Sequence, residues 1–176
     1  MRLPADATLI VVDPQEAIDH TDRGAGLAPG VDANLASLIA AWRKEGLPVV
    51  HVRLCNAPER PFKACATPLE GEAVIGASAA SAFAASELED LLDAAGATTV
   101  VLCGPLNAVE PSARDAANLG YQIFIPFDAC SPAVSSAESV VARLHGETAA
   151  VVDTAAALGA AATAKTRQRR DAERRR

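Results

Sequence analysis

Four apolar residues, Leu9 to Val12, followed directly by Asp13 and Pro14, constrain the fold of this chain more than any other stretch. The run has no polar alternation, which is typical of a strand buried on both faces of a parallel sheet. Pro14 lacks a backbone donor and therefore ends the strand. Ligands bind at the carboxyl ends of strands in open α/β sheets, so Asp13 is a candidate for chemistry. The alternative, in which Asp13 only caps the following turn, stays open at this point.

The amino-acid composition predicts one cytoplasmic domain. The chain has 176 residues, which is the length of a single domain with a core of its own. Half of the residues are hydrophobic but only 3% are aromatic, so we expect a core of Ala, Val, Leu and Ile. No secretory leader precedes the first strand and no apolar run approaches the length of a membrane span, so we expect neither export nor a membrane partner. The four cysteines have no metal-ligand spacing and are expected to be reduced thiols: Cys55, Cys65, Cys103 and Cys130.

Charge is distributed unevenly along the chain. The net charge is −6, but residues 165–176 contain seven basic and two acidic residues, which leaves −11 on the rest. An acidic body does not favour nucleic acid as a partner. We expect a folded domain over residues 1–160 and a basic, disordered tail over residues 161–176. The tail is interpreted as a solvated extension, although a weak contact with a polyanion or an acidic partner stays open.

Alternating strands and helices predict the fold class. A strand, helix, strand order with short connections implies parallel neighbouring strands joined by right-handed crossovers. We therefore expect a three-layer α/β/α fold, with an open, mainly parallel, Rossmann-like sheet and helices on both faces. After the first strand we expect a loop at 20–30, a helix that is capped by Asp32 and ends at Gly46, a strand at 48–53 and a long loop at 54–80. A helix with a capping box at 86–89 then ends at Gly96. The remaining expected elements are strands at 98–103, 121–125 and 149–152, helices at 111–119 and 138–144, and a final helix from Asp153.

Several short motifs follow one another in a specific order between residues 8 and 158. They are Val12-Asp13-Pro14-Gln15, Ala40-Ala-Trp-Arg43, Gly46-Leu-Pro-Val-Val-His-Val-Arg53, Pro68 to Glu72, Ser81-Ala-Phe83, Glu87-Leu-Glu89 and Ala113-Arg-Asp-Ala-Ala-Asn-Leu-Gly120. This ordered set resembles the isochorismatase-like, or cysteine hydrolase, superfamily. The resemblance implies a hydrolase fold whose active site lies at the carboxyl ends of the strands.

The resemblance also implies a mechanism with three working side chains. An aspartate acts as general base and acid, a lysine favours the thiolate, and a cysteine after the fourth strand is the nucleophile. Asp13 matches the aspartate, but Ala77 stands at the lysine position and Ala108 at the cysteine position. The loop from Gly104 to Ala108 is shorter than the family pattern, so the expected oxyanion-hole segment is altered too. Only one of the three catalytic side chains is therefore retained.

Neighbouring residues offer few replacements for the missing groups. Cys103 ends the strand predicted at 98–103, which precedes the family's cysteine position. It is a weak alternative nucleophile, because a lone cysteine in an apolar strand is more often a small core residue. Nicotinamidase-like members of the superfamily bind zinc after the second strand, where His51 is the one plausible ligand and Leu54 stands at the next expected position. One histidine does not make a metal site, so we expect no metal and no cofactor. The predicted pocket around Asp13 contains Gln15, His51, Phe83, Cys103, Leu106 and Asn107.

These residues leave three functional hypotheses. The first is a protein that has lost cysteine-dependent hydrolysis and acts as a binding or assembly subunit, with a small-molecule ligand and a homo-oligomer or partner subunit as its expected partners. The second is an Asp-dependent hydrolase that uses Asp13 as acid and base on a vinyl ether of the isochorismate type. The third, a cysteine amidohydrolase with Cys103 as nucleophile, ranks last.

Overall fold

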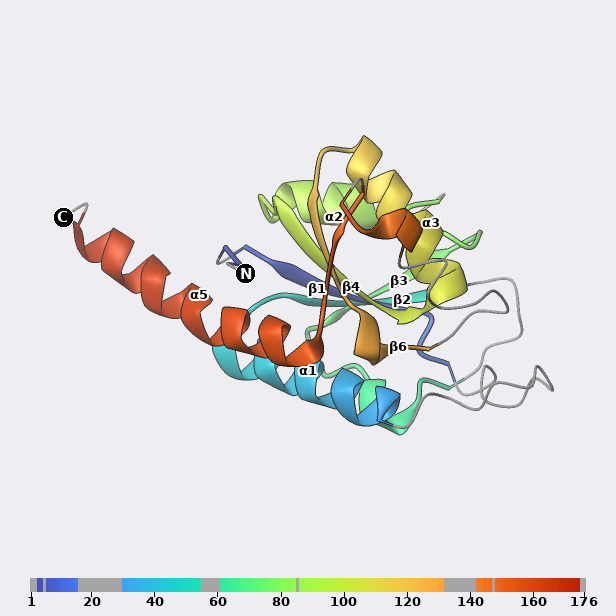
Figure 1. Ribbon diagram of the computed structural model, residues 1–176, viewed down its shortest axis with the longest axis horizontal. Helices are drawn as coiled ribbons and strands as arrows, with labels where there is room; N and C mark the ends of the chain where they lie inside the picture. The colour runs from blue at the N-terminus through green and yellow to red at the C-terminus, as the bar shows by residue number, and fades with distance from the viewer. Residues whose placement is uncertain are drawn as a thin grey trace.

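A parallel β-sheet lies at the centre of the protein, with helices on both of its faces (Figure 1). This computed structural model describes residues 3–4, 6–15, 30–54, 61–84, 86–131, 142–146 and 148–174. The seven strands follow the order β3-β2-β1-β4-β5-β7, with β6 paired to the end of β4. All pairings between these strands are parallel. The predicted α/β/α fold with a mainly parallel sheet is therefore confirmed.

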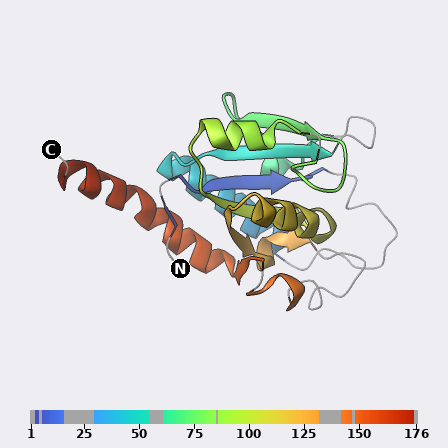
Figure 2. The same cartoon turned by 90° about the horizontal axis from the view of Figure 1, so that it is seen from above.

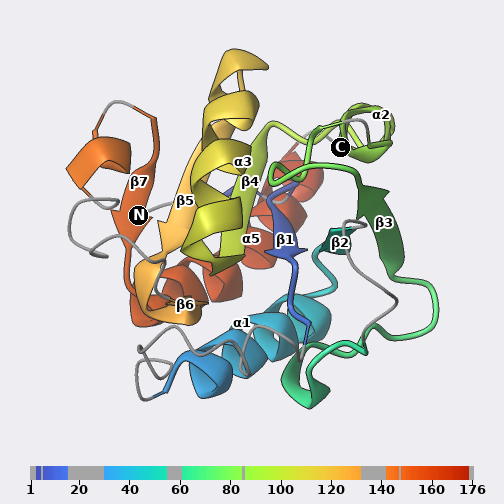
Figure 3. The same cartoon turned by 90° about the vertical axis from the view of Figure 1, so that its right-hand side faces the viewer.

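The elements are arranged in three layers. Figures 2 and 3 show helices α2 and α3 on one face of the sheet and helices α1 and α5 on the other. The strands are β1 Thr8–Val12, β2 Val49–Leu54, β3 Ala73–Ala77, β4 Thr99–Pro105, β5 Gln122–Pro126, β6 Cys130–Ser131 and β7 Ala150–Val152. The helices are α1 Val31–Glu45, α2 Leu88–Ala94, α3 Leu106–Asn118 and α5 Thr154–Arg174, with 3-10 turns η2 Ala64–Ala66 and η3 Phe127–Ala129. In the described parts of the chain, no helix has the length and apolar character needed to cross a membrane.

Strand β1 is the centre of the core, as its apolar run predicts. All five of its residues are buried, because β2 and β4 flank it and helices cover both faces. Val11 lies between His51 of β2 and Cys103 of β4. Burial of each large aliphatic side chain contributes about 1.5–3 kcal/mol relative to exposure. The strand thus fixes the position at which Asp13 leaves the sheet.

Helix α1 has the predicted apolar stripe and the predicted end, but not the predicted cap. Leu35, Leu38, Ile39 and Trp42 are buried against the sheet, and Gly46 ends the helix with a left-handed φ of 64°. The residue before the first turn is Gly30, and no side chain caps the helix. Asp32 lies in the first turn instead, where a carboxylate interacts favourably with the helix dipole. The predicted Asp32 cap is therefore wrong.

The other boundaries differ from prediction in three places. The segment predicted as a loop at 54–80 contains strand β3, which pairs with β2 at the sheet edge. Helix α3 begins at Leu106, so Pro111 lies inside it and not at its start. Helix α2 begins at Leu88, and the amide of Leu88 donates a 3.3 Å hydrogen bond to Ser86 Oγ. Half of the predicted capping box is thus present: Ser86 Oγ accepts a helix-start amide, whereas Glu87, directly before the helix, makes no side-chain cap bond.

Helix α5 packs on α1 and then extends beyond the body of the protein (Figure 1). Its buried alanines, among the side chains that the structure describes, form a stripe of small residues: Ala157, Ala160, Ala161 and Ala164. The helix continues to Arg174 and so includes most of the segment predicted as a disordered tail. The domain boundary near residue 160 stays a prediction. The predicted loop at 20–30 lies almost entirely outside the described residues, as does most of the predicted helix at 138–144, of which residues 142–144 are helical.

Candidate functional site

Asp13 lies directly after β1, at the carboxyl edge of the sheet. Its φ of 48° makes it the one non-glycine residue with positive φ among the described residues. Its amide donates a 2.7 Å hydrogen bond to the Val52 carbonyl, and its own carbonyl accepts one of 2.9 Å from the Gln15 amide. A left-handed conformation costs a non-glycine residue about 1–2 kcal/mol, and such residues are concentrated at functional sites. The backbone therefore holds Asp13 in a conformation that the strand alone does not require.

A pocket lined by Asp13, Asp32 and Lys63, here called the Asp13 pocket, lies on the α1 side of the sheet. Its walls come from the ends of β1 and β4, the first turns of α1, the start of the η2 segment and β6. Its volume of about 20 Å³ is close to the space that one water molecule requires. The enclosed part of the pocket is thus about the size of one small polar group. Its lining includes Asp13, Asp32, Leu35, Lys63, Pro105 and Ser131.

Lys63 reaches this pocket from the connection between β2 and β3. Its amide donates a 2.8 Å hydrogen bond to the Pro14 carbonyl, next to an antiparallel bridge between Gln15 and Phe62. Its Nζ donates to Asp32 Oδ1 at 3.1 Å. The Lys63 side chain is only 11% exposed, whereas that of Asp32 is 47% exposed. The pocket therefore contains two carboxylates and one largely buried ammonium group.

Ala77 and Ala108 are buried in the core and do not line the Asp13 pocket. Ala77 ends the edge strand β3, and Ala108 lies in the first turn of α3, on the opposite face from α1. Helix α3 follows β4 without an intervening loop, because Pro105 ends the strand and Leu106 begins the helix. Methyl groups therefore occupy both positions at which the resemblance places charged or nucleophilic groups.

The β4 end lies very close to β1 at Gly104. Its φ is 132°, and a Cβ there would collide with the Val12 carbonyl oxygen. Only glycine has both the conformational freedom and the small size for this approach. The close contact positions the β4–α3 junction directly beside Asp13.

Cys103 is enclosed in the sheet and is a poor nucleophile. Its side chain is fully buried, and Sγ donates a 3.7 Å hydrogen bond to the Ile10 carbonyl. Burial raises the pKa of the Cys103 thiol well above its usual range, and burial also raises the pKa of Cys130 to about 12. A thiolate is the reactive form of cysteine, so neither buried thiol is activated. Cys65 is half-buried, and Cys55 lies outside the described residues.

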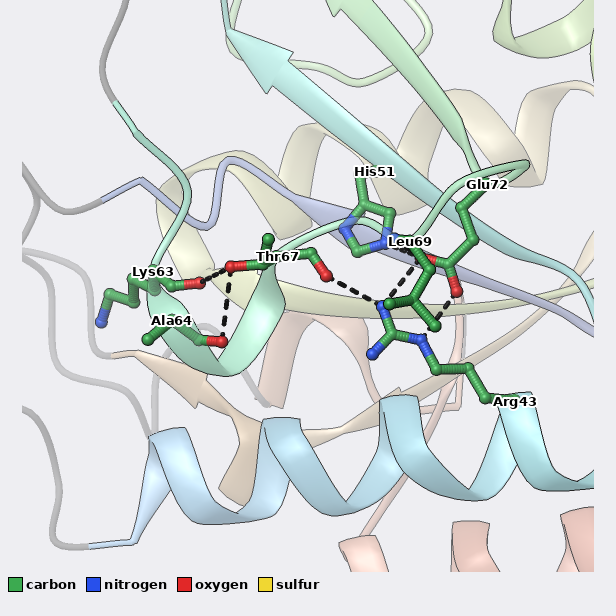
Figure 4. A network of polar contacts seen from close by, with 7 residues as sticks. All are labelled: Arg43, His51, Lys63, Ala64, Thr67, Leu69 and Glu72. Carbon is green, nitrogen blue, oxygen red and sulfur yellow. Dashed lines mark hydrogen bonds and ion pairs between the residues drawn. The ribbon is translucent and has the colours of Figure 1, made fainter.

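His51 belongs to a polar network between β2, α1 and the segment that precedes β3 (Figure 4). Its Nε2 lies 3.0 Å from Glu72 Oε2, which also accepts 2.8 Å and 2.9 Å hydrogen bonds from Arg43 Nη2 and the Leu69 amide. Arg43 Nε donates to the other carboxylate oxygen at 2.7 Å, and Arg43 Nη2 donates to the Thr67 carbonyl at 2.9 Å. The network thus ties three segments of the chain together through one carboxylate.

Electrostatics in this network keep Glu72 ionised and His51 neutral. The Arg43 guanidinium holds the pKa of Glu72 at about 2. Burial lowers the pKa of His51, although its hydrogen bond to Glu72 opposes this. A neutral imidazole then donates its Nε2 proton to an ionised Glu72. The imidazole ring also packs edge-on against the Phe62 ring, with 5.9 Å between the ring centroids. The described residues contain no group of three His, Cys, Asp or Glu side chains that would hold a metal ion.

Comparison with known proteins assigns the family. Residues 7–156 match the isochorismatase domain. The chain belongs to the isochorismatase family. It is 33% identical over 132 residues to streptothricin hydrolase from Streptomyces noursei, covering 69% of this chain but only 48% of that enzyme. The isochorismatase-family protein YrdC from Bacillus subtilis is 27% identical over 133 residues, which cover 69% of this chain and 71% of YrdC.

Solved structures of the isochorismatase family have the same fold. A family member from Chromobacterium violaceum superimposes with a TM-score of 0.81 and 30% identity, covering 93% of this chain and 97% of the other. A cysteine hydrolase from Pseudomonas syringae has a TM-score of 0.82 over 92% of this chain and 95% of its own, but at 18% identity it shows the fold alone. The resemblance inferred from the ordered motifs is thus confirmed.

The residues predicted to form a pocket with Asp13 do not line the Asp13 pocket of this isochorismatase-family protein. Three of them, His51, Cys103 and Leu106, are fully or almost fully buried, and Gln15 is 5% exposed in its bridge to Phe62. Phe83 is half-buried beside Tyr121 with a centroid distance of 6.0 Å, and Asn107 is exposed.

Sequence reasoning missed Asp32, Lys63 and Ser131 as neighbours of Asp13. One signal was available for Lys63, since the chain contains only three lysines and the other two are Lys44 and Lys165. A single lysine in the long connection after the second strand was therefore a candidate for the missing cation. No comparable signal marked Ser131.

Proposed function

We propose that this isochorismatase-family protein does not perform cysteine-dependent hydrolysis and acts as a binding or assembly subunit in the cytoplasm. The observation that carries the proposal is Ala108, whose buried methyl group stands where the family nucleophile is expected. Ala77 supports it, because no cation is available there to favour a thiolate. The direct passage from β4 to α3 also supports it, because the resemblance places the oxyanion donors in this shortened segment.

Neither of the buried thiols near the carboxyl edge offers a substitute nucleophile. Cys103 donates its proton to a backbone carbonyl inside the sheet, and its raised pKa keeps it protonated at neutral pH. Its strand packs tightly, so a substrate carbonyl has no route to Sγ without opening the sheet. The intact core around lost chemical groups supports a role that depends on the shape of the protein. A homo-oligomer or a partner subunit, together with a small ligand at Asp13, is the form of that role we propose.

The first test measures thiol-dependent hydrolysis directly. The purified protein is incubated with amide and activated-ester substrates, and ammonia and acid release are followed beside the Cys103→Ala variant. We expect no turnover above background for either protein. Hydrolysis that is abolished by Cys103→Ala would overturn the proposal, whereas equal background rates support it.

The second test measures assembly. Light scattering after size-exclusion chromatography gives the mass of the purified chain, and affinity purification of the tagged chain identifies bound proteins from its own cell. We expect a mass above that of one 18.1 kDa chain or a stoichiometric partner. A strictly monomeric chain without a partner or a ligand would contradict the assembly role.

A second candidate function is acid catalysis by Asp13 on an enol ether. The left-handed backbone of Asp13 and its place in a pocket favour this candidate. A carboxylic acid that protonates the enol ether carbon makes the ether bond hydrolysable, and no nucleophilic thiol is needed. Release of pyruvate from isochorismate is followed with a coupled dehydrogenase, and Asp13→Asn is the control. Turnover that Asp13→Asn abolishes would establish this function, and no turnover on enol ethers would reject it.

A further inference from the structure

Lys63 lines the Asp13 pocket together with Asp13 and Asp32. A lysine side chain that is 11% exposed has lost most of its hydration, and a buried charge is costly unless other groups compensate. Asp32 provides one such group at 3.1 Å, but Asp32 is itself 47% exposed and partly solvated. Asp13 is the other carboxylate in the lining of the same pocket. The charge of Lys63 thus shares the lining of one pocket with two carboxylates, those of Asp32 and Asp13.

The backbone fixes Lys63 at this place more firmly than an ordinary loop lysine. Its amide bonds to the Pro14 carbonyl, one residue after Asp13, so the two chain segments run side by side at the carboxyl edge. The bridge between Gln15 and Phe62 extends this pairing by one residue on each segment. On the other side of η2, the Arg43 contact to the Thr67 carbonyl ties the segment to α1. Both ends of the segment that carries Lys63 are therefore anchored.

We propose that Lys63 supplies the cation of the Asp13 site and acts on the Asp13 carboxylate across the pocket on the α1 side. The site then has a carboxylate and an ammonium group although position 77 is alanine, because the positive charge comes from the β2–β3 connection and not from the end of β3. Lys63 is a positioning residue in this sense, since it acts through Asp13. The inference deepens the ligand-binding part of the proposed function, but it concerns charge in the unliganded protein and can be tested without any substrate.

A purely structural role for Lys63 makes a different prediction. If the ammonium group only anchors its segment to α1 through Asp32, substituting Lys63 or Asp32 breaks the same ion pair. The two substitutions then reduce stability equally and leave the pKa of Asp13 unchanged. If Lys63 acts on Asp13, the Lys63 and Asp32 substitutions shift the pKa of Asp13 in opposite directions. Loss of the positive neighbour favours the neutral carboxyl form, whereas loss of the negative neighbour favours the carboxylate.

The experiment follows the Asp13 carboxyl carbon by NMR in the full chain labelled with ¹³C-aspartate, with Asp13→Asn used to assign the signal. An opposite charge within a few ångström changes a carboxyl pKa by about 1–3 units, so we expect Lys63→Met to raise the pKa of Asp13 by about one unit or more. Lys63→Arg should leave it nearly unchanged, and Asp32→Asn should lower it. Lys44→Met, at an exposed position in the last turn of α1, is the matched control and should have no effect.

An Asp13 pKa that is unchanged or lowered in Lys63→Met would overturn the inference. If Lys63→Met does not fold, Lys63→Gln decides the question, since a raised Asp13 pKa supports the inference and an unchanged or lowered one refutes it. These readouts do not depend on catalysis or assembly. The proposed function can therefore fail while the Lys63 inference holds, and the reverse is equally detectable.

Discussion

Glu72 should carry a large share of the stability of this protein at neutral pH. Its carboxylate is 14% exposed and accepts hydrogen bonds from Arg43, His51 and the Leu69 amide. The pKa of Glu72 falls from 4.5 to about 2 in the folded protein, chiefly because of Arg43. This difference corresponds to about 3 kcal/mol of folding free energy at pH 7. Because the folded pKa is the lower one, that stability is fully present above pH 4.5 and is lost as the pH falls toward 2.

The substitution Glu72→Gln tests this reasoning, because the amide keeps the size of the side chain but cannot form the ion pair. We expect the free energy of unfolding at pH 7 to fall by about 3 kcal/mol, which corresponds to about 6–12 °C in Tm for a domain of this size. Urea unfolding followed by circular dichroism between pH 2 and pH 7 provides the measurement. The variant should also lose the part of the pH dependence between pH 4.5 and 2 that the wild type owes to Glu72.

Glu70→Gln is the matched control, since Glu70 is exposed and lies two residues away. We expect a change within about 0.5 kcal/mol, as for most surface substitutions. If Glu72→Gln were as mild as Glu70→Gln, or if the variant kept the full acid sensitivity of the wild type, Glu72 would not be the residue that holds the three segments together.

Two further predictions concern the carboxyl edge of the sheet. Gly104→Ala should destabilise the protein by more than about 2 kcal/mol in thermal unfolding, because its φ is 132° and the new methyl group would collide with the Val12 carbonyl. Gly96→Ala is the control: its φ is 64° and there is open space around it, so this substitution should cost about 1 kcal/mol. Similar losses for the two variants would contradict the close approach. Iodoacetamide at pH 8 should label half-buried Cys65 before Cys103, whose pKa is raised by burial, and mass spectrometry should detect Cys103 labelling only after urea is added. Early labelling of Cys103 would show that its strand opens.

The sequence predicted those parts of the fold that depend on local periodicity. Leu9 to Val12 forms a fully buried strand because continuous apolar residues suit a strand with neighbours on both sides. The α1 stripe from Leu35 to Trp42 is buried because its spacing follows the helical repeat. Strand β3 escaped prediction because an edge strand has one neighbour and needs little apolar alternation, and its Val74 is 49% exposed.

The candidate site was predictable only where a single strand end decides it. Asp13 follows from the end of β1, but the Lys63–Asp32 pair joins residues 31 positions apart and forms only after the segment before β3 has packed on α1. The start of α3 was placed too late because Pro111 looks like a first-turn residue. Burial of Leu106 and Val109 favours a helix that begins directly after β4. Pro111 then lies inside the helix, where its nitrogen cannot donate a backbone hydrogen bond.

The direct junction between β4 and α3 would make the proposed loss of thiol chemistry difficult to reverse. Placing a cysteine at position 108 alone would put a sulfur into a site that is 1% exposed, on the face of the sheet opposite the Asp13 pocket. An engineered revertant needs extra backbone between Pro105 and Leu106 as well, and any such insertion must preserve the close approach of Gly104 to Val12. Introducing the family's thiol chemistry would therefore require a coordinated change of chain length and side chain, which single substitutions cannot provide.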